Sequence, residues 1–229
     1  MERSDNVLVA IEGIDGSGKG TQARRLTQTL SDQGRRVELL SFPRYDDTFF
    51  GRTVGRFLNG EFGSLSEANP FLVSLLFAGD RFESRELLRE KMESNDLVIL
   101  DRYVASNIAH QGSKLPVEQQ PSLIEFVQTL EYEIYGLPRA TLNVLLDLPA
   151  ETAQELIGRK NARSYTEQSH DLQEADRDYL ESVRQTYLTV AERHPDSWRI
   201  ISAQNENGLR SIESIGEELL TLVLQAADS

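Results

Sequence analysis

A glycine-rich segment near the start of the chain has the residue types and spacing of a phosphate-binding loop. It consists of Gly13, Ile14, Asp15, Gly16, Ser17, Gly18, Lys19, Gly20 and Thr21. Glycines let successive backbone N–H groups converge on a phosphate at the positive end of a helix, and Lys19 would reach the outer phosphates. The usual motif places Ser or Thr directly after the lysine, whereas here Gly20 takes that position, which leaves metal coordination by the loop open. The alternative is a glycine-rich turn that only joins a strand to a helix.

A carboxylate and a guanidinium follow another apolar run. Asp101 and Arg102 come directly after residues 97–100, which read Leu-Val-Ile-Leu. Ligands of open parallel sheets bind beyond the carboxyl ends of the strands, so both side chains should face the same crevice as Lys19. Phosphoryl transfer needs a carboxylate for Mg²⁺ and cations for the phosphate oxygens, whereas the alternative for this pair is a plain salt bridge.

An aromatic and a basic residue share one helix face. Phe77 and Arg81 are four residues apart in a predicted helix, so the ring could stack on a base while the guanidinium binds its polar edge. The alternative is that Phe77 belongs to the core and Arg81 is solvated.

These residues are positioned by an alternation of strands and helices. The apolar runs 7–11, 37–40, 97–100, 142–146 and 198–201 predict strands, and the amphipathic stretches 21–33, 69–92, 121–135, 171–193 and 209–226 predict helices. Such alternation predicts an α/β fold with a doubly wound parallel five-stranded sheet flanked by helices. A length of 229 residues predicts a single domain over residues 1–229.

A polar segment at residues 158–170 interrupts this rhythm. It reads GRKNARSYTEQSH, starts with basic residues and lacks apolar periodicity. A polar stretch between two helices is either an exposed connection or a short lid over the ligand.

The net charge and the residue composition exclude several classes of ligand and of metal site. The chain has 24 basic and 37 acidic residues, a net charge of −13, and no cysteine. The charge disfavours broad binding to nucleic acid or to an anionic membrane surface, so any anionic ligand must be held locally. The absence of cysteine excludes disulfides and thiolate metal sites. Neither a signal peptide nor an apolar stretch of about 18 residues is present, which predicts a cytoplasmic protein.

Taken together, these motifs resemble those of the thymidylate kinases, and the likeness covers nearly the whole chain. The resemblance rests on residues 11–19, the Phe-Pro-Arg-Tyr turn at 42–45, the Leu-Phe-Ala-Gly-Asp-Arg run at 76–81 and the run DRYVASNIAHQG at 101–112. It implies the fold of a P-loop nucleoside monophosphate kinase that transfers the γ-phosphoryl group of ATP to dTMP in dTTP biosynthesis. It also implies Mg²⁺ as cofactor and a homodimer, for which the helix with Phe71, Leu72, Leu75 and Leu76 is apolar enough.

The resemblance assigns the donor side of the reaction as follows. ATP would bind the loop 13–21, with Lys19 on its β- and γ-phosphates. Asp15 would serve the acceptor sugar and the metal–water shell. Asp101 and Glu174 would complete the metal site, and Arg102 would bridge the donor and acceptor phosphates.

On the acceptor side, the resemblance implies that Phe77 stacks on thymine, Arg81 binds its carbonyl edge and Arg44 holds the phosphate. The full dTMP set it implies is Asp15, Phe42, Arg44, Tyr45, Phe77, Arg81, Arg102, Asn107, His110 and Gln111.

Two departures from the family accompany this assignment. Some thymidylate kinases carry a catalytic arginine within the phosphate loop, where this chain has Gly16, so the lid cations Arg159, Lys160 and Arg163 would supply that charge. Many relatives have a tyrosine that helps to reject a ribose 2′-hydroxyl where this chain has His110. Two other functions stay open: a kinase for another nucleotide or a nucleoside, and a nucleotide-binding sensor without turnover.

Overall fold

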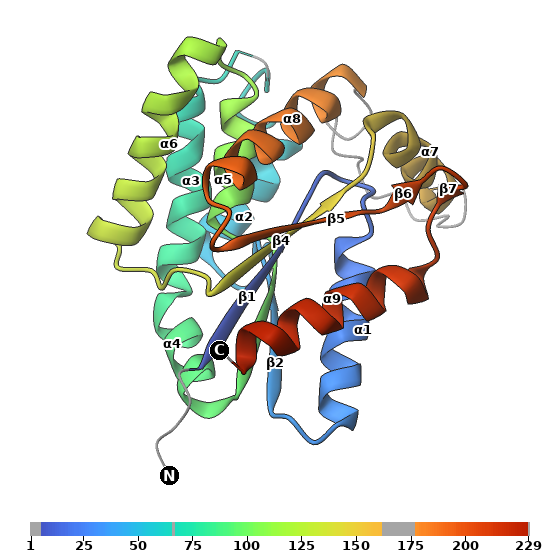
Figure 1. The fold of residues 1–229 in the computed structure, drawn as a ribbon. Coiled ribbons are helices and arrows are strands. Elements are labelled where there is room, and N and C mark those ends of the chain that lie inside the picture. Colours follow the sequence, from blue (N-terminus) through green and yellow to red (C-terminus); the bar gives the residue numbers. More distant parts are fainter. Residues whose placement is uncertain (1–5, 66, 162–176, 229) are drawn as a thin grey trace.

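The computed structural model describes residues 6–65, 67–161 and 177–228, with the side chains of 159–161 outside the description. Its centre is a sheet of five parallel strands in the order β2-β3-β1-β4-β5, which confirms the predicted fold class (Figure 1). The strands are β1 (Val7–Glu12), β2 (Val37–Ser41), β3 (Leu97–Asp101), β4 (Leu142–Asp147) and β5 (Trp198–Ser202). A small hairpin, β6 (Gln204–Asn205) with β7 (Gly208–Leu209), follows β5.

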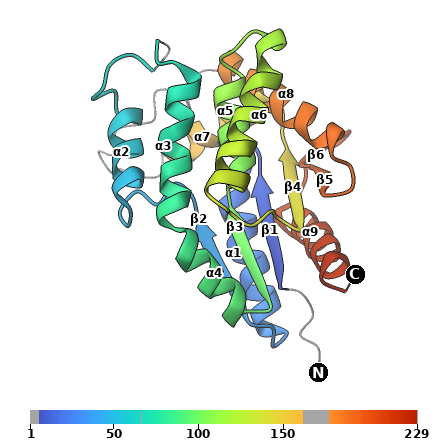
Figure 2. The ribbon, with the colours of Figure 1, turned by 90° about the vertical axis from the view of Figure 1, so that its left-hand side faces the viewer.

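The helices cover both faces of the sheet (Figures 1 and 2). Helices α1 and α9 contact each other and cover one face, while α8 packs on β4 and β5 and contacts α5, which in turn contacts α3 and α6. Their bounds are α1 (Lys19–Asp32), α2 (Phe49–Leu58), α3 (Pro70–Glu83), α4 (Arg85–Ser94), α5 (Val104–Gly112), α6 (Gln120–Gln128), α7 (Ala150–Asn161), α8 (Arg177–Arg193) and α9 (Ile212–Ala227). A 3-10 turn (Val117–Gln119) precedes α6, and a π-helical turn (Thr129–Ile134) follows it.

The strand register brings the chemistry-bearing residues to one edge of the sheet. All six residues of β1 are buried, as expected for a strand covered on both faces. Ile11 near the end of β1 is aligned with Asp101 of β3 and with Val144 of β4. The phosphate loop after β1 and the Asp101–Arg102 pair after β3 therefore emerge side by side.

Two predicted helices differ in the structure, and α2, α5 and α7 were not predicted as helices. The predicted helix 69–92 is two helices, because the Ser84 hydroxyl donates to the Asp80 carbonyl at 2.9 Å and competes with the helical pattern there. The predicted helix 121–135 ends in the π-helical turn. Helix α5 was not predicted, because eight of its nine residues are buried and it therefore lacks an amphipathic pattern.

The predicted lid is only partly described. Residues 158–161 form the last turn of α7, whereas residues 162–170 lie outside the described part of the chain. The same holds for Arg163 and Glu174 and for the side chains of Arg159 and Lys160. In the described ranges, no helix has the length and apolar character needed to span a membrane.

The surroundings of two helical glycines, Gly79 in α3 and Gly158 in α7, predict opposite effects for the same substitution to alanine. An added Cβ at Gly79 would lie 2.6 Å from the ring of Phe50, so Gly79→Ala should destabilise the protein by about 1–3 kcal/mol. At Gly158 no atom of the described residues lies within 4 Å of an added Cβ, so Gly158→Ala should stabilise it by about 0.5–1 kcal/mol. Urea unfolding measures both changes, and equal destabilisation at the two sites would contradict this packing.

Candidate active site

The phosphate loop leaves the N-terminus of α1 open to an anion. Gly18 is the N-cap residue, with φ of +89°, and having no side chain it cannot cap the first N–H groups itself. The positive end of the helix dipole is therefore available to a phosphate. At Gly16 an added Cβ would lie 2.5 Å from the carbonyl oxygen of Ala153 in α7. The close approach of α7 explains why the loop carries no side chain, and hence no arginine, at this position.

Lys19 is buried beneath this loop. It is 6% exposed, and its Nζ donates to the carbonyl of Ile14 at 2.7 Å. Burial and the positive charge of Arg102 lower the pKa of Lys19 to about 8, although the carboxylates of Asp15 and Asp101 act in the opposite direction.

Asp101 lies beside the position where the usual motif has a hydroxyl. Its Oδ2 would be 3.0 Å from a Cβ added at Gly20, so a carboxylate oxygen borders the space that a Ser or Thr side chain would enter. Among the described residues, no cluster of three or more His, Cys, Asp or Glu could hold a metal alone. The oxygen donors fit Mg²⁺, which is commonly held by one or two carboxylates together with substrate phosphates.

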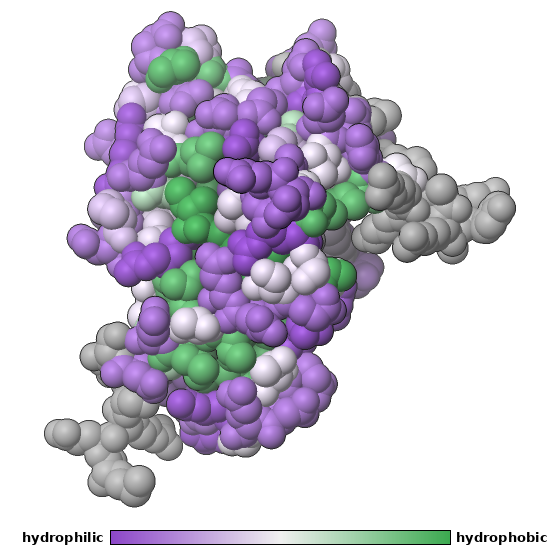
Figure 3. Space-filling model, turned by 45° about the vertical axis from the view of Figure 1, so that its right-hand side comes forward, coloured by the Kyte–Doolittle hydropathy of each residue, from purple (hydrophilic) through white to green (hydrophobic). Residues whose placement is uncertain are grey.

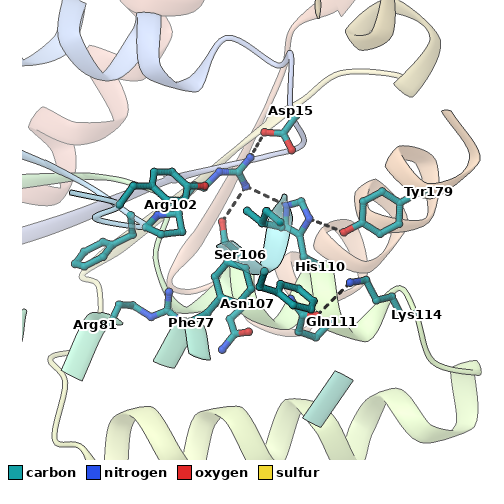
Figure 4. A pocket seen from close by; sticks show the side chains of 15 residues that line it. Asp15, Phe77, Arg81, Arg102, Ser106, Asn107, His110, Gln111, Lys114 and Tyr179 are labelled. Carbon is teal, nitrogen blue, oxygen red and sulfur yellow. Dashed lines mark hydrogen bonds and ion pairs between the residues drawn. The ribbon is translucent and has the colours of Figure 1, made fainter. Parts of the chain in front are cut away.

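Arg102 is fixed from several sides. Its backbone has φ of +71°, rare for a residue with a side chain. One terminal nitrogen, Nη2, forms an ion pair with Asp15, and Nη1 lies 3.3 Å from the Ser106 hydroxyl and 3.0 Å from Nε2 of His110 (Figure 4). Burial acts to lower the pKa of Arg102, but the negative charges around it, Asp15 first and then Asp101 and Glu12, together raise this pKa. Burial likewise acts to raise the pKa of Asp15, while Arg102 and Lys19 lower it well below its usual value.

The neighbours of His110 determine its tautomer. Arginine only donates hydrogen bonds, so Nε2 of His110 must accept from Arg102 and the proton must sit on Nδ1. Nδ1 then donates to the Tyr179 hydroxyl at 2.9 Å. Burial and the charge of Arg102 lower the pKa of His110 to about 3, so the ring is neutral at physiological pH.

The buried carboxyl group of Glu12 holds the side chains that lie next to Arg102. Glu12 at the end of β1 is fully buried and accepts from the Tyr103 N–H at 2.8 Å, the Ser106 hydroxyl at 2.6 Å and the Tyr187 hydroxyl at 3.0 Å. Burial raises the pKa of Glu12 above its usual value, although the hydrogen bond from Ser106 opposes this. Ser106, which also contacts Arg102, is thereby held in place.

A cavity runs from Arg102 toward α3 (Figure 4). Nine of the ten residues predicted for the acceptor line it: Asp15, Phe42, Tyr45, Phe77, Arg81, Arg102, Asn107, His110 and Gln111. Six further lining residues were not predicted: Pro43, Phe57, Leu58, Ser106, Lys114 and Tyr179. They lie in a loop, at the ends of helices or within buried α5, where spacing carries no functional signal.

Arg44 is the exception among the predicted acceptor residues. Within the described chain it is not part of the cavity lining. Its Nη2 forms an ion pair with Asp47 at 3.0 Å and its Nη1 lies 3.4 Å from the Ser84 hydroxyl. Its backbone N–H donates to Asp80 at 3.0 Å, so the structure shows Arg44 bracing the turn after β2.

The far end of the cavity contains a buried ion pair. Arg81 is 2% exposed and pairs through Nε and Nη2 with Glu131, which is fully buried. Burial acts to lower the pKa of Arg81, but the charge and hydrogen bonds of Glu131, together with the charge of Asp80, raise this pKa. Nδ2 of Asn107 also donates to Glu131, at 3.0 Å. Sequence reasoning missed Glu131 because it lies 50 residues from Arg81 in an unremarkable Leu-Glu-Tyr run.

Three largely buried cations, Lys19, Arg81 and Arg102, therefore line the site of a strongly acidic chain. Hydrophilic residues make up most of the surface seen in Figure 3, with apolar residues in separate patches. A lysine under a glycine loop, a carboxylate at a strand end and an arginine between loop and cavity define a P-loop phosphotransferase of the nucleoside monophosphate kinase type.

Comparisons with known proteins agree with this class. The family model described as thymidylate kinase matches residues 11–213. A protein named thymidylate kinase from Mycobacterium tuberculosis is 32% identical over 203 residues, covering 88% of this chain and 94% of the relative. A probable thymidylate kinase from Thermococcus gammatolerans is 33% identical, covering 96% of each chain, and the human thymidylate kinase is 28% identical, covering 97% of this chain and 92% of the relative.

The chain belongs to the thymidylate kinase family. Its activity is therefore that of an ATP-dependent nucleoside monophosphate kinase that phosphorylates dTMP.

The lowered pKa of Lys19 predicts that ATP binding takes up a proton above neutral pH. At pH 8.5 a lysine with a pKa of about 8 is mostly uncharged, and a bound phosphate favours its charged form. Titration calorimetry without added divalent cation, in buffers of different ionisation enthalpy, should show uptake of more than about half a proton per ATP. Lys19→Arg, which stays charged, is the control and should show none; zero uptake by the unmodified chain would contradict the burial argument.

The tautomer of His110 predicts a direct spectroscopic signature. In ¹⁵N-labelled protein, Nε2 of His110 should give the signal of an unprotonated nitrogen and Nδ1 that of an N–H group, unchanged from pH 5 to pH 9. His110→Gln identifies the signals by their loss. A His110 ring that titrates near the usual value of about 6.5 would refute this arrangement.

Proposed function

We propose that dTMP occupies the cavity with its base between Phe77, Arg81 and Asn107 and its phosphate at Arg102. The phosphates of ATP lie on the loop 13–21. The observation that supports this proposal is the cavity itself, which has the guanidinium of Arg102 at one end and the polar side chains of Arg81 and Asn107 at the other.

The hydrogen-bonding edge matches thymine. Thymine presents the acceptor O4 beside the donor N3–H, whereas cytosine presents a donor beside an acceptor. Glu131 engages Nε and Nη2 of Arg81, which leaves the Nη1 hydrogens to meet O4. Oδ1 of Asn107 is buried and has no partner among the described residues, so it can accept from N3–H. The ring of Phe77 provides a stacking surface.

The chemistry required of the protein is mainly electrostatic. The dTMP phosphate is already an anionic nucleophile, so in-line transfer needs positioning and neutralisation of charge more than a general base. Arg102 binds the acceptor phosphate and meets the charge that develops on the transferred group, and Lys19 binds the donor phosphates. Asp101 and Asp15, with Glu174, would hold Mg²⁺, which neutralises the oxygens of the donor phosphates.

The lid is proposed to supply the remaining cations. Because α7 excludes a side chain at Gly16, transition-state charge must be met from elsewhere. Arg159 and Arg163 are assigned this role, with closure excluding water from the transfer.

The proposed assembly is a cytoplasmic homodimer that binds neither nucleic acid nor membranes. Leu72 on α3 is 65% exposed and Ile134 after α6 is 67% exposed. Such large exposed apolar side chains on neighbouring elements favour a second copy as the partner.

A coupled ADP-release assay tests the function. ATP·Mg²⁺ is combined in turn with dTMP, dUMP, the ribose form of TMP, dCMP, AMP, GMP and thymidine. Highest turnover is expected with dTMP. Preference for another acceptor would reassign the base pocket, and no turnover by folded protein that binds ATP would support a nucleotide sensor.

Replacing Arg102 should abolish turnover while the chain still folds. Arg102→Ala is expected to lower kcat by about 10³–10⁵-fold, as for other arginines that stabilise a transferring phosphoryl group. Arg35→Ala is the matched control, because Arg35 forms a 3.7 Å ion pair with Asp228 outside the cavity. Near-normal kcat in folded Arg102→Ala protein would refute the assignment.

A further inference from the structure

The base end of the cavity is held by a carboxylate that does not itself line the cavity. Glu131, in the π-helical turn Thr129–Ile134, is fully buried. Its Oε1 accepts from Nη2 of Arg81 at 2.6 Å and from Nδ2 of Asn107 at 3.0 Å, and its Oε2 accepts from Nε of Arg81. One carboxylate thus binds both side chains that face the base edge.

The contacts of Asn107 leave its amide a single orientation. Its Nδ2 lies 3.0 Å from Oε1 of Glu131 and 3.0 Å from the carbonyl oxygen of Ser74. An ionised carboxylate and a carbonyl only accept hydrogen bonds. If the amide were flipped, Oδ1 would face two acceptors and both hydrogen bonds would be lost.

The orientation of Asn107 decides what the cavity offers a ligand. With Nδ2 engaged by Glu131 and Ser74, Oδ1 is the remaining polar atom of this side chain. It is buried without a partner among the described residues, and a buried acceptor without a partner selects for a ligand that donates. A flipped amide would offer N–H groups and would suit the N3 acceptor of cytosine.

We propose that Glu131 is a specificity-determining positioning residue that makes the site read thymine rather than cytosine. Its negative charge aligns the Arg81 donors and, together with the Ser74 carbonyl, holds Asn107 so that the amide presents its acceptor. The recognition edge therefore has the order donor then acceptor. The proposal rests on the proposed placement of the base at this end of the cavity. Glu131 touches neither base nor phosphate and acts only through Arg81 and Asn107.

The experiment compares kcat/KM for dTMP and dCMP in matched variants. Glu131→Gln removes the charge that aligns Arg81 and, among the described residues, leaves the Ser74 carbonyl alone to hold Nδ2 of Asn107. The flipped amide then loses one hydrogen bond instead of two, so the dTMP to dCMP ratio should fall by about tenfold or more. The KM for ATP should not change. Glu133→Gln is the control, because Glu133 is exposed in the same turn, and its ratio should equal that of the unmodified chain.

A second substitution, Asn107→Asp, tests whether Glu131 sets the dTMP to dCMP ratio of kcat/KM or only stabilises the fold. Asn107→Asp places two carboxylates side by side and should weaken both reactions. The double variant Glu131→Gln with Asn107→Asp keeps one carboxylate beside Arg81 and again presents an acceptor to the base. Its dTMP to dCMP ratio of kcat/KM should therefore be higher than that of Glu131→Gln alone. The double variant can be compared with the unmodified chain even if either single variant fails to fold.

The outcomes separate this proposal from the proposed function. An unmodified chain that prefers dTMP, together with folded Glu131→Gln that keeps its ratio within about twofold, overturns the role of Glu131 and leaves the function intact. A folded double variant without recovery overturns it as well. An unmodified chain that does not prefer dTMP overturns both.

Discussion

The active site depends on three basic side chains that stay charged and keep a fixed orientation although they are largely buried. Lys19, Arg81 and Arg102 are each largely withdrawn from water, in a chain whose net charge is −13. Removing such charges from water is costly unless opposite charges and hydrogen bonds accompany them. The Arg102–Asp15 and Arg81–Glu131 pairs meet this requirement. The same partners fix the direction in which each guanidinium points.

The fold makes this arrangement possible because parallel strands end at a common edge. Asp15 follows β1 and Arg102 follows β3, and the register of these two strands brings them together. Short, buried α5 then carries Ser106, Asn107 and His110 along the cavity. Glu12 and Glu131, which lie behind the lining, set the positions of Ser106 and Asn107 respectively by accepting their hydrogen bonds. In the proposed binding mode, phosphate and base are recognised in the same way: a buried carboxylate holds the group that meets the ligand.

The sequence was sufficient to predict those features that depend on local pattern. Apolar runs identified the five strands, and glycine and lysine spacing identified the phosphate loop. Features that depend on distant contacts were not predictable: Glu131 meets Arg81 across 50 residues, and His110 meets Tyr179 across 69. Buried α5 has no amphipathic signal, and the break at Ser84 depends on one side-chain hydrogen bond. The role of Arg44 at the acceptor phosphate comes from the resemblance and stays a prediction; its contacts with Asp47, Asp80 and Ser84 within and beside the turn after β2 were not predictable from spacing.

The most direct test of this account is a crystal structure of the protein with dTMP and a non-hydrolysable ATP analogue. The account predicts that the base stacks on Phe77, that N3–H donates to Oδ1 of Asn107, and that O4 accepts from Arg81. It also predicts that Arg102 contacts the dTMP phosphate while the analogue's phosphates lie over Lys19. A base bound outside this cavity, or an Asn107 amide turned with Nδ2 toward the base, would contradict it.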